Sequence, residues 1–177
     1  LNKQSFFDEG DSFGIHYGQL FTEYGSIIKI PKSRVNDFGG SFKSKVNDVL
    51  MPTSDVTPNG LAKASCIAIS DVILGGDILV IRANPETIYG PYLSYVIRNS
   101  PEKIQSLVSG TTVYHIYAKD MKEFRLFLPS VEEQKLIVDA LSQADSLVTQ
   151  TQTLLDKYSN IKQGMAHDLL TGKVRLV

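Results

Sequence analysis

The sequence predicts an α+β protein in which a head of mixed, mostly antiparallel sheet (residues 1–128) precedes one long coiled-coil-forming α-helix (residues 129–177). In the head, short apolar runs alternate with glycine, proline, asparagine and serine, which is typical of strands with short helices between them. From Ser130 to Gln163 there is neither glycine nor proline, and apolar residues recur at helical spacing. The 177 residues, 42% of them hydrophobic, suffice for one globular domain and an appendage.

The head is expected to contain strands that are rich in valine, isoleucine and tyrosine and bounded by turn-forming residues. These strands cover residues 46–51, 66–69, 76–82, 111–117 and 124–128. Two short helices are expected at residues 91–98 and 101–108, because each has proline in its first turn and a polar stop after it.

The long helix is expected to begin with a capping box, in which the Ser130 hydroxyl accepts from the Glu133 amide and the Glu133 carboxylate accepts from the Ser130 amide. It stops at Thr171 and Gly172, so some 40 residues span about 60 Å. Apolar side chains recur at alternating spacings of four and three, the pattern of a coiled-coil seam. The seam comprises Ile137, Leu141, Ala144, Val148, Thr151, Leu155, Tyr158, Lys162, Met165 and Leu169. A helix lying across its own domain would leave much of this seam in water, so we expect a partner helix.

Composition excludes several classes of protein. Eighteen Lys and Arg against 19 Asp and Glu give a net charge of −1, which shows no overall footprint of a nucleic-acid binder. No apolar run could span a bilayer, and the single cysteine, Cys66, lies in an apolar stretch that predicts a buried thiol. We therefore expect a soluble, cytoplasmic protein. Because the chain starts at Leu1 without a signal segment, we also expect it to be a piece of a longer one.

The sequence offers no catalytic or metal-binding motif. It contains no phosphate-binding loop, no strand-linked G-x-G-x-x-G, and no Cys or His pair at metal-ligand spacing. The segment 84–87, Asn-Pro-Glu-Thr, lacks the second proline and the aromatic residue of an amino-methyltransferase motif. We assign no catalytic residue and no metal site, which leaves an enzyme with an unrecognised site as the weakest interpretation.

One basic segment, nearly free of acids apart from Asp37, is the best local candidate for phosphate contact. Its cations are Lys29, Lys32, Arg34, Lys43 and Lys45. A solvated strand edge protected by lysines would show the same pattern.

Three segments near the C-terminus form an ordered motif: residues 127–137 contain Leu-Pro-x-x-x-Glu-Gln, residues 141–145 contain Leu-x-x-x-Asp, and residues 162–174 end in Leu-Leu-Thr-Gly-Lys-Val. This order resembles the helical conserved region of the specificity subunit of type I restriction-modification systems. Residues 76–79, 92–95 and 110–113 are similar to that family's target recognition domain, so the resemblance covers essentially the whole chain.

The resemblance implies a non-catalytic subunit that reads one half of a bipartite site in double-stranded DNA and docks modification (methyltransferase) and restriction subunits. S-adenosylmethionine, ATP and magnesium are then expected on those subunits only, so no cofactor is expected here. A complete specificity subunit is similar to two such units in tandem with antiparallel helices. The chain resembles the second unit or a half-length subunit that forms a dimer, so its helix is expected to pair with a second half or a second copy.

Under this interpretation, polar side chains in loops of the head contact DNA bases. The candidates are Ser54, Asp55, Thr57, Asn59 and Lys63 in one turn-rich loop, and Tyr89, Ser109, Thr111, Thr112 and Tyr114 in a second group. Ordinary loop polarity explains these residue types equally well. The alternative function is a coiled-coil protein-interaction adaptor without DNA binding, whose head binds a peptide or protein.

Overall fold

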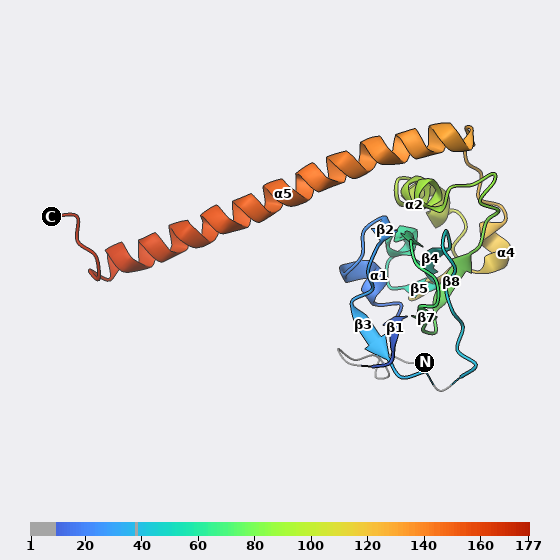
Figure 1. Ribbon diagram of the computed structural model, residues 1–177, viewed down its shortest axis with the longest axis horizontal. Coiled ribbons are helices and arrows are strands. Elements are labelled where there is room, and N and C mark those ends of the chain that lie inside the picture. The colour runs from blue at the N-terminus through green and yellow to red at the C-terminus, as the bar shows by residue number, and fades with distance from the viewer. Residues whose placement is uncertain (1–9, 38) are drawn as a thin grey trace. The chain divides into compact units, whose positions relative to one another are not determined.

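The computed structural model of the protein describes residues 10–37 and 39–177, in two compact units that meet between Lys135 and Leu136. The first unit contains β1 (Ser12–Ile15), α1 (Gln19–Thr22), β2 (Ile27–Ile28), β3 (Ser33–Val35), β4 (Val49–Pro52), β5 (Ser54–Asp55), the 3₁₀ helix η2 (Pro58–Ala62), β6 (Ser65–Ile67), β7 (Ile73–Leu74), β8 (Ile78–Ile81), α2 (Gly90–Arg98), α3 (Pro101–Gln105), β9 (Tyr114–His115) and α4 (Ala118–Met121). The long helix α5 (Val131–Leu170) begins in the first unit and forms most of the second (Figure 1). The α+β class with a long C-terminal helix is confirmed.

The strands form three small sheets, with the orders β3-β1-β7, β2-β6-β4-β8 and β5-β9. Most pairs are antiparallel, whereas β1–β7 and β2–β6 are parallel. The sheet of the head is therefore mixed and mostly antiparallel, as the sequence predicts.

The central strand β4 separates two hydrophobic clusters. Its side chains alternate, with Val49 and Met51 in the cluster beneath η2, α2 and α3, and Leu50 in the cluster beside β1 and α1. The neighbouring strand β6 divides in the same way, because Cys66 belongs to the first cluster and Ile67 to the second. Burial raises the pKa of the Cys66 thiol to about 12, so this cysteine is the buried core thiol that the sequence predicts.

Four of the expected strands are present but shorter, and for two of them the backbone gives the reason. Asn47 adopts a left-handed φ of 77° and Asp77 a left-handed φ of 59°, so β4 and β8 begin only after these residues. β6 ends at Ile67, and β9 contains only two residues. The two helices begin where expected, although α3 ends at Gln105.

The strand expected at residues 124–128 is wrong. The carbonyls of this segment accept hydrogen bonds from side chains, because Lys103 Nζ donates to the Arg125 carbonyl over 3.2 Å and the Tyr92 hydroxyl donates to the Phe127 carbonyl over 2.8 Å. Phe124 is buried in the first hydrophobic cluster. These two carbonyls are thus satisfied by side chains instead of by a neighbouring strand.

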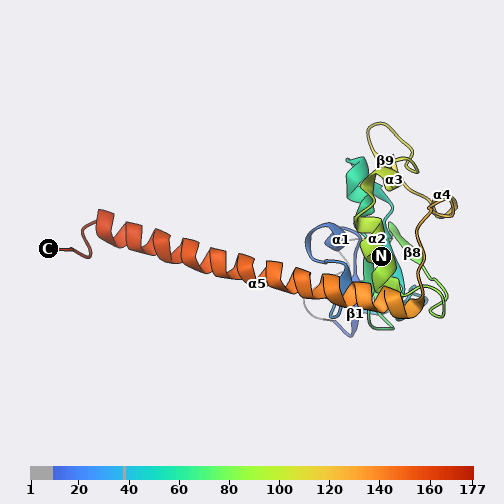
Figure 2. The ribbon, with the colours of Figure 1, turned by 90° about the horizontal axis from the view of Figure 1, so that it is seen from above.

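The helix α5 follows the sequence prediction closely. The Glu133 amide donates to the Ser130 hydroxyl over 3.3 Å, which confirms that half of the capping box. The helix then runs without a break to Leu170 (Figures 1 and 2). Beyond its end, Gly172 has a φ of 72° and its amide donates to the Leu169 carbonyl, as expected of a glycine stop.

Candidate nucleic-acid interface

Two loops that are distant in sequence meet at the small sheet β5–β9. Ser54 pairs with His115 and Asp55 pairs with Tyr114. Ser109 extends this contact, because its amide and carbonyl exchange hydrogen bonds of 2.9 and 2.7 Å with the backbone of His115. The structure therefore brings together members of both groups of predicted base-contacting residues.

Within the first loop, Asp55 and Thr57 are engaged in holding the loop itself. The Thr57 hydroxyl donates to the Asp55 carboxylate over 2.8 Å and accepts from the Gly60 amide over 3.3 Å, while the Val56 amide donates to the other Asp55 oxygen. A Cβ at position 60 would meet the Asp55 carboxylate where it now lies, so a larger residue there would have to displace the Asp55 side chain. Asn59 is exposed and better placed for an external partner.

The second loop presents exposed side chains around a tight turn. Gly110 adopts a φ of 113°, and a Cβ there would collide with the Val113 carbonyl. Glycine at this position thus permits the close approach that exposes Thr111 and Thr112. Lys63, which follows η2, is exposed as well.

Two lysines of the predicted basic segment already form ion pairs on the surface. Lys32 Nζ lies 2.6 Å from the Glu23 carboxylate, and Lys43 Nζ lies 2.7 Å from the Asp37 carboxylate. In each pair the acid raises the pKa of the lysine, and the lysine lowers the pKa of the acid. The Lys32–Glu23 pair is solvent-exposed, whereas the Asp37 side chain is only 19% exposed, so a phosphate can compete with the carboxylate more easily at Lys32 than at Lys43.

The other three cations have different surroundings. The Arg34 guanidinium lies 4.5 Å from the centre of the Phe13 ring and donates to the Gly10 carbonyl. Lys29 and Lys45 are exposed. The five cations lie on or near the sheet β3-β1-β7 and the edge strand β2, whereas the polar loops belong to the sheet β5–β9.

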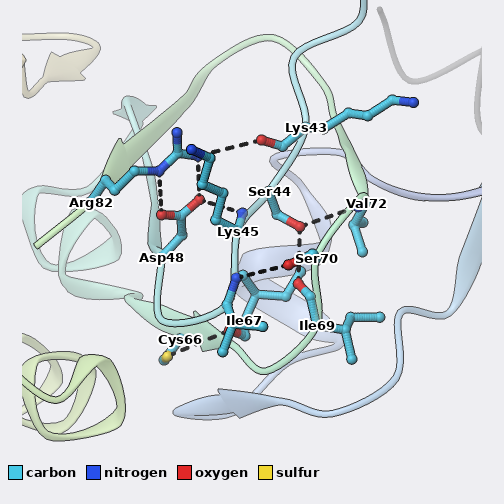
Figure 3. A network of polar contacts seen from close by, with 11 residues as sticks. Lys43, Ser44, Lys45, Asp48, Cys66, Ile67, Ile69, Ser70, Val72 and Arg82 are labelled. Carbon is cyan, nitrogen blue, oxygen red and sulfur yellow. Dashed lines mark hydrogen bonds and ion pairs between the residues drawn. The ribbon is translucent and has the colours of Figure 1, made fainter. Parts of the chain in front are cut away.

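A buried carboxylate fixes the backbone that carries Lys43 and Lys45 (Figure 3). Asp48, which is fully buried, accepts two hydrogen bonds of 2.8 and 2.7 Å from the Arg82 guanidinium and one of 2.8 Å from the Lys45 amide. Arg82 also donates to the Lys43 carbonyl. The Lys43 side chain points away from this network. The sequence analysis did not single out Asp48 or Arg82, because nothing in their local pattern indicates an ion pair between residues so far apart.

Tyr89 lies at a different position from the rest of its predicted group, at the start of α2. Its amide donates to Gln134 Oε1 over 2.8 Å, and Gln134 Nε2 donates to the carbonyls of Thr87 and Pro129 over 3.0 and 2.9 Å. The Asn47 side-chain amide also donates to the Ile88 carbonyl and accepts from the Gly90 amide. The segment before α2 is therefore fixed by two amide side chains, of which Gln134 is fully buried.

The second unit presents most of its seam residues to solvent. Val148 is 69% exposed, Tyr158 60% and Met165 59%. The Thr151 hydroxyl donates to the Leu147 carbonyl over 2.8 Å, so its polar group is satisfied within the helix. The seam is thus mostly apolar, and the Thr151 hydroxyl does not oppose packing against another helix.

Within residues 10–37 and 39–177, no group of three or more histidine, cysteine, aspartate or glutamate side chains could hold a metal ion. In the same residues, none of the helices has the length and hydropathy required to cross a membrane.

Residues 17–157 match the family model described as the type I restriction modification DNA specificity domain. The chain belongs to this family. It is 28% identical over 97% of its length to a Methanocaldococcus jannaschii protein named as the specificity subunit of the type I restriction enzyme MjaX. It is 26% identical over 92% of its length to a Mycoplasma pneumoniae protein named as a type I specificity subunit.

A solved structure has a similar fold. The S subunit of a type I restriction-modification system from M. genitalium superposes with a TM-score of 0.58 at 20% identity and covers 95% of this chain. The chain in turn covers 38% and 44% of the two relatives and 40% of the solved chain. It therefore spans about two fifths of the length of the proteins that it matches.

Proposed function

We propose that this specificity-family chain is one recognition unit, whose head reads one half of a bipartite site in double-stranded DNA. The observation that carries this proposal is the pairing of β5 with β9 in a member of a DNA specificity family, because it joins two polar loops into one surface. Ser54, Asn59, Ser109, Thr111 and Thr112 supply side chains able to bond base edges from this surface.

The basic segment supplies the phosphate contacts in this proposal. Lys29 and Lys45 are exposed. Lys32 and Lys43 can contact DNA when a phosphate replaces the carboxylate with which each is paired. Arg34 is held over the Phe13 ring, so its guanidinium is already ordered. Contacts of this kind fix the register of the protein on the duplex and carry no sequence information themselves.

The helix α5 then acts as a spacer that pairs with the helix of a second unit or a second copy. Charge supports an antiparallel pair. The first half of the helix carries four acids, Glu132, Glu133, Asp139 and Asp145, against one base, Lys135. Within α5 beyond Gln150, the bases Lys157 and Lys162 balance the acids Asp156 and Asp168, and two further bases, Lys173 and Arg175, follow the end of the helix. An antiparallel arrangement places the acidic first half of each helix beside the charge-balanced second half of its partner and the basic residues that follow it, whereas a parallel arrangement would place the two acidic halves side by side.

Catalysis belongs to partner subunits in this proposal. Modification and restriction subunits dock on the recognition unit and bring S-adenosylmethionine, ATP and magnesium with them. The chain itself neither methylates nor cuts DNA, and its contribution is to place those subunits at a chosen sequence.

The alternative function is an adaptor that binds proteins through its head. The ion pairs of Lys32 and Lys43 favour it, because they neutralise two of the cations that the DNA proposal uses. Filter binding to random-sequence duplex DNA over a salt series separates the two functions. A head that contacts phosphates binds with an affinity that falls steeply as salt rises, whereas an adaptor shows no such binding.

The variant Lys29→Gln with Lys45→Gln makes this experiment specific. It should reduce the slope of log K against log salt by about 1.8, since each phosphate contact contributes about 0.9. Lys157→Gln, which lies on α5, is the control for the change in net charge and should leave the slope unchanged. Absence of salt-dependent binding by the unmodified chain would contradict the proposed function.

A further inference from the structure

His115 at the end of β9, Tyr117 and Lys119 form a cluster whose side chains have no role in the contacts described above, although the His115 backbone does. The rings of His115 and Tyr117 are stacked, with their centres 6.1 Å apart and their planes 16° from parallel. Lys119 Nζ lies 5.7 Å from the centre of the Tyr117 ring. We call these residues the Tyr117 cluster.

The backbone holds this cluster at both ends. On one side, His115 pairs with Ser54 and exchanges hydrogen bonds with Ser109. On the other side, the Tyr117 amide donates to the Asp120 carboxylate over 3.1 Å, and the Asp120 amide donates to the Tyr117 carbonyl over 3.0 Å. Tyr117 is therefore fixed between a strand pair and the first turn of α4.

Although it is fixed, the Tyr117 side chain is 50% exposed. An aromatic ring packed for stability is normally buried, whereas this ring is supported by an imidazole and an ammonium group at the surface. A side chain ordered in advance loses little conformational entropy when a ligand binds. The arrangement therefore suits an external contact better than it suits the core.

The chemistry of the exposed groups indicates the ligand. The Tyr117 hydroxyl and the Lys119 ammonium, which lies over the same ring, offer a neutral donor and a cation, the groups that proteins use on phosphate oxygens. Ser54, Ser109 and Tyr114, which are proposed to contact bases, belong to the same strand pair. A phosphate contact here would hold the DNA strand against those side chains.

We propose that Tyr117 and Lys119 form a further phosphate-contacting site of the DNA interface, with His115 as a positioning residue that supports the Tyr117 ring. This proposal rests on the proposed function. Its residues lie outside the basic segment, which is the phosphate-contacting region predicted from the sequence. It predicts that the phosphodiester backbone is held close to the base-reading loops as well as at the sheet β3-β1-β7.

The test is filter binding of the full 177-residue chain to random-sequence duplex DNA over a salt series. Lys119→Gln should lower the affinity and reduce the slope of log K against log salt by about 0.9. Tyr117→Phe keeps the ring and its stack and removes only the hydroxyl, so it should lower the affinity about fivefold with an unchanged melting temperature. His115→Ala should lower the affinity without changing the slope. Lys157→Gln is again the control for net charge.

The outcomes are distinct. If the unmodified chain binds in a salt-dependent manner but Tyr117→Phe and Lys119→Gln both bind as tightly as it does, the cluster is not a DNA contact and the inference is wrong. A selection of bound sequences from a random pool should recover the same half-site with each variant, and a change of bases would show that the cluster reads sequence instead. If the unmodified chain shows no binding at any salt concentration, the proposed function fails and this inference fails with it.

Discussion

The head and the helix α5 differ in how far their large apolar side chains are buried. In the head, both faces of β4 are covered, and buried polar side chains such as Asp48 and Ser94 have hydrogen-bond partners. Along α5, large apolar side chains such as Val148 and Tyr158 remain more than half exposed. The head thus buries its apolar residues within itself, whereas the helix leaves a large apolar surface exposed, which we propose that a partner helix covers.

The largest effect is expected from changing the seam. We expect the chain to self-associate through α5, and the triple variant Leu141→Asp, Val148→Asp and Leu155→Asp to be a monomer, because three carboxylates cannot be buried in an apolar interface. Sedimentation measures the association, and circular dichroism checks that the head still folds.

As a control, aspartate substitutions at Ser142, Thr149 and Asn160, which lie outside the seam, should leave association intact. An unmodified chain that is monomeric at tens of micromolar would show that the exposed stripe needs no partner.

A length change in α5 tests whether the helix sets distance while the head sets sequence. Four residues inserted after Gln150 add about one turn, or about 5.4 Å, and should lengthen the preferred gap between half-sites by about one or two base pairs. One inserted residue should instead rotate the seam by about 100° and impair assembly. Selection of bound sequences from a random pool measures both. A change in half-site bases with an unchanged gap would contradict the spacer role.

The buried amide at the start of α5 should matter for stability. Gln134→Leu removes the hydrogen-bond partners of the Tyr89 amide and of the Thr87 and Pro129 carbonyls, so the free energy of unfolding should fall by roughly 3 kcal/mol. Urea unfolding measures this change. The matched control Gln163→Leu, at an exposed position of the same helix, should change it by less than about 0.5 kcal/mol. Equal effects of the two variants would show that the amide does not fix the segment before α2.

The effect that is smallest at neutral pH, because it develops only under alkaline conditions, concerns Cys66. Its pKa is about 12 in the folded protein against an ordinary value of 9.0, so above pH 9 the unfolded chain loses a proton that the folded chain keeps. The stability that the protonated thiol contributes to the folded state is fully present below pH 9. It is lost as the pH rises toward 12, when the free energy of unfolding falls by up to about 1.4 kcal/mol per pH unit. Urea unfolding under reducing conditions should show a shallower alkaline loss of stability for Cys66→Ala. Parallel pH profiles of the two proteins would mean that the thiol ionises equally well in the fold.

The helices were predictable because their signals are local. Proline marks the first turns of α2 and α3, and the capping serine and the terminal glycine mark the limits of α5. The two-residue strands β2, β5 and β7 have too few residues to show alternation, and the parallel pairs β1–β7 and β2–β6 join distant segments. No local pattern reports such pairing.

The same distinction applies to the candidate site. Residue type was enough to select the lysines of the basic segment and the polar loops. It could not show that Asp55 and Thr57 bond each other, that Asp37 and Glu23 pair with lysines, or that β5 and β9 meet. Tyr117 was missed because its significance lies in the ring and the ammonium beside it, which come together only through the turn into α4.

The connection between the head and α5 determines where the chain can be recombined. Residues 124–129 follow their course because Lys103 of α3, Tyr92 of α2 and Gln134 of α5 bind their carbonyls. A chimera that joins a foreign head to this helix at residue 128 would separate Gln134 from the Tyr89 and Thr87 backbone that it binds. A crossover placed after Lys135 transfers every one of these contacts with the head. Recognition units of this fold should therefore be exchangeable as cassettes that include the first turn of the long helix.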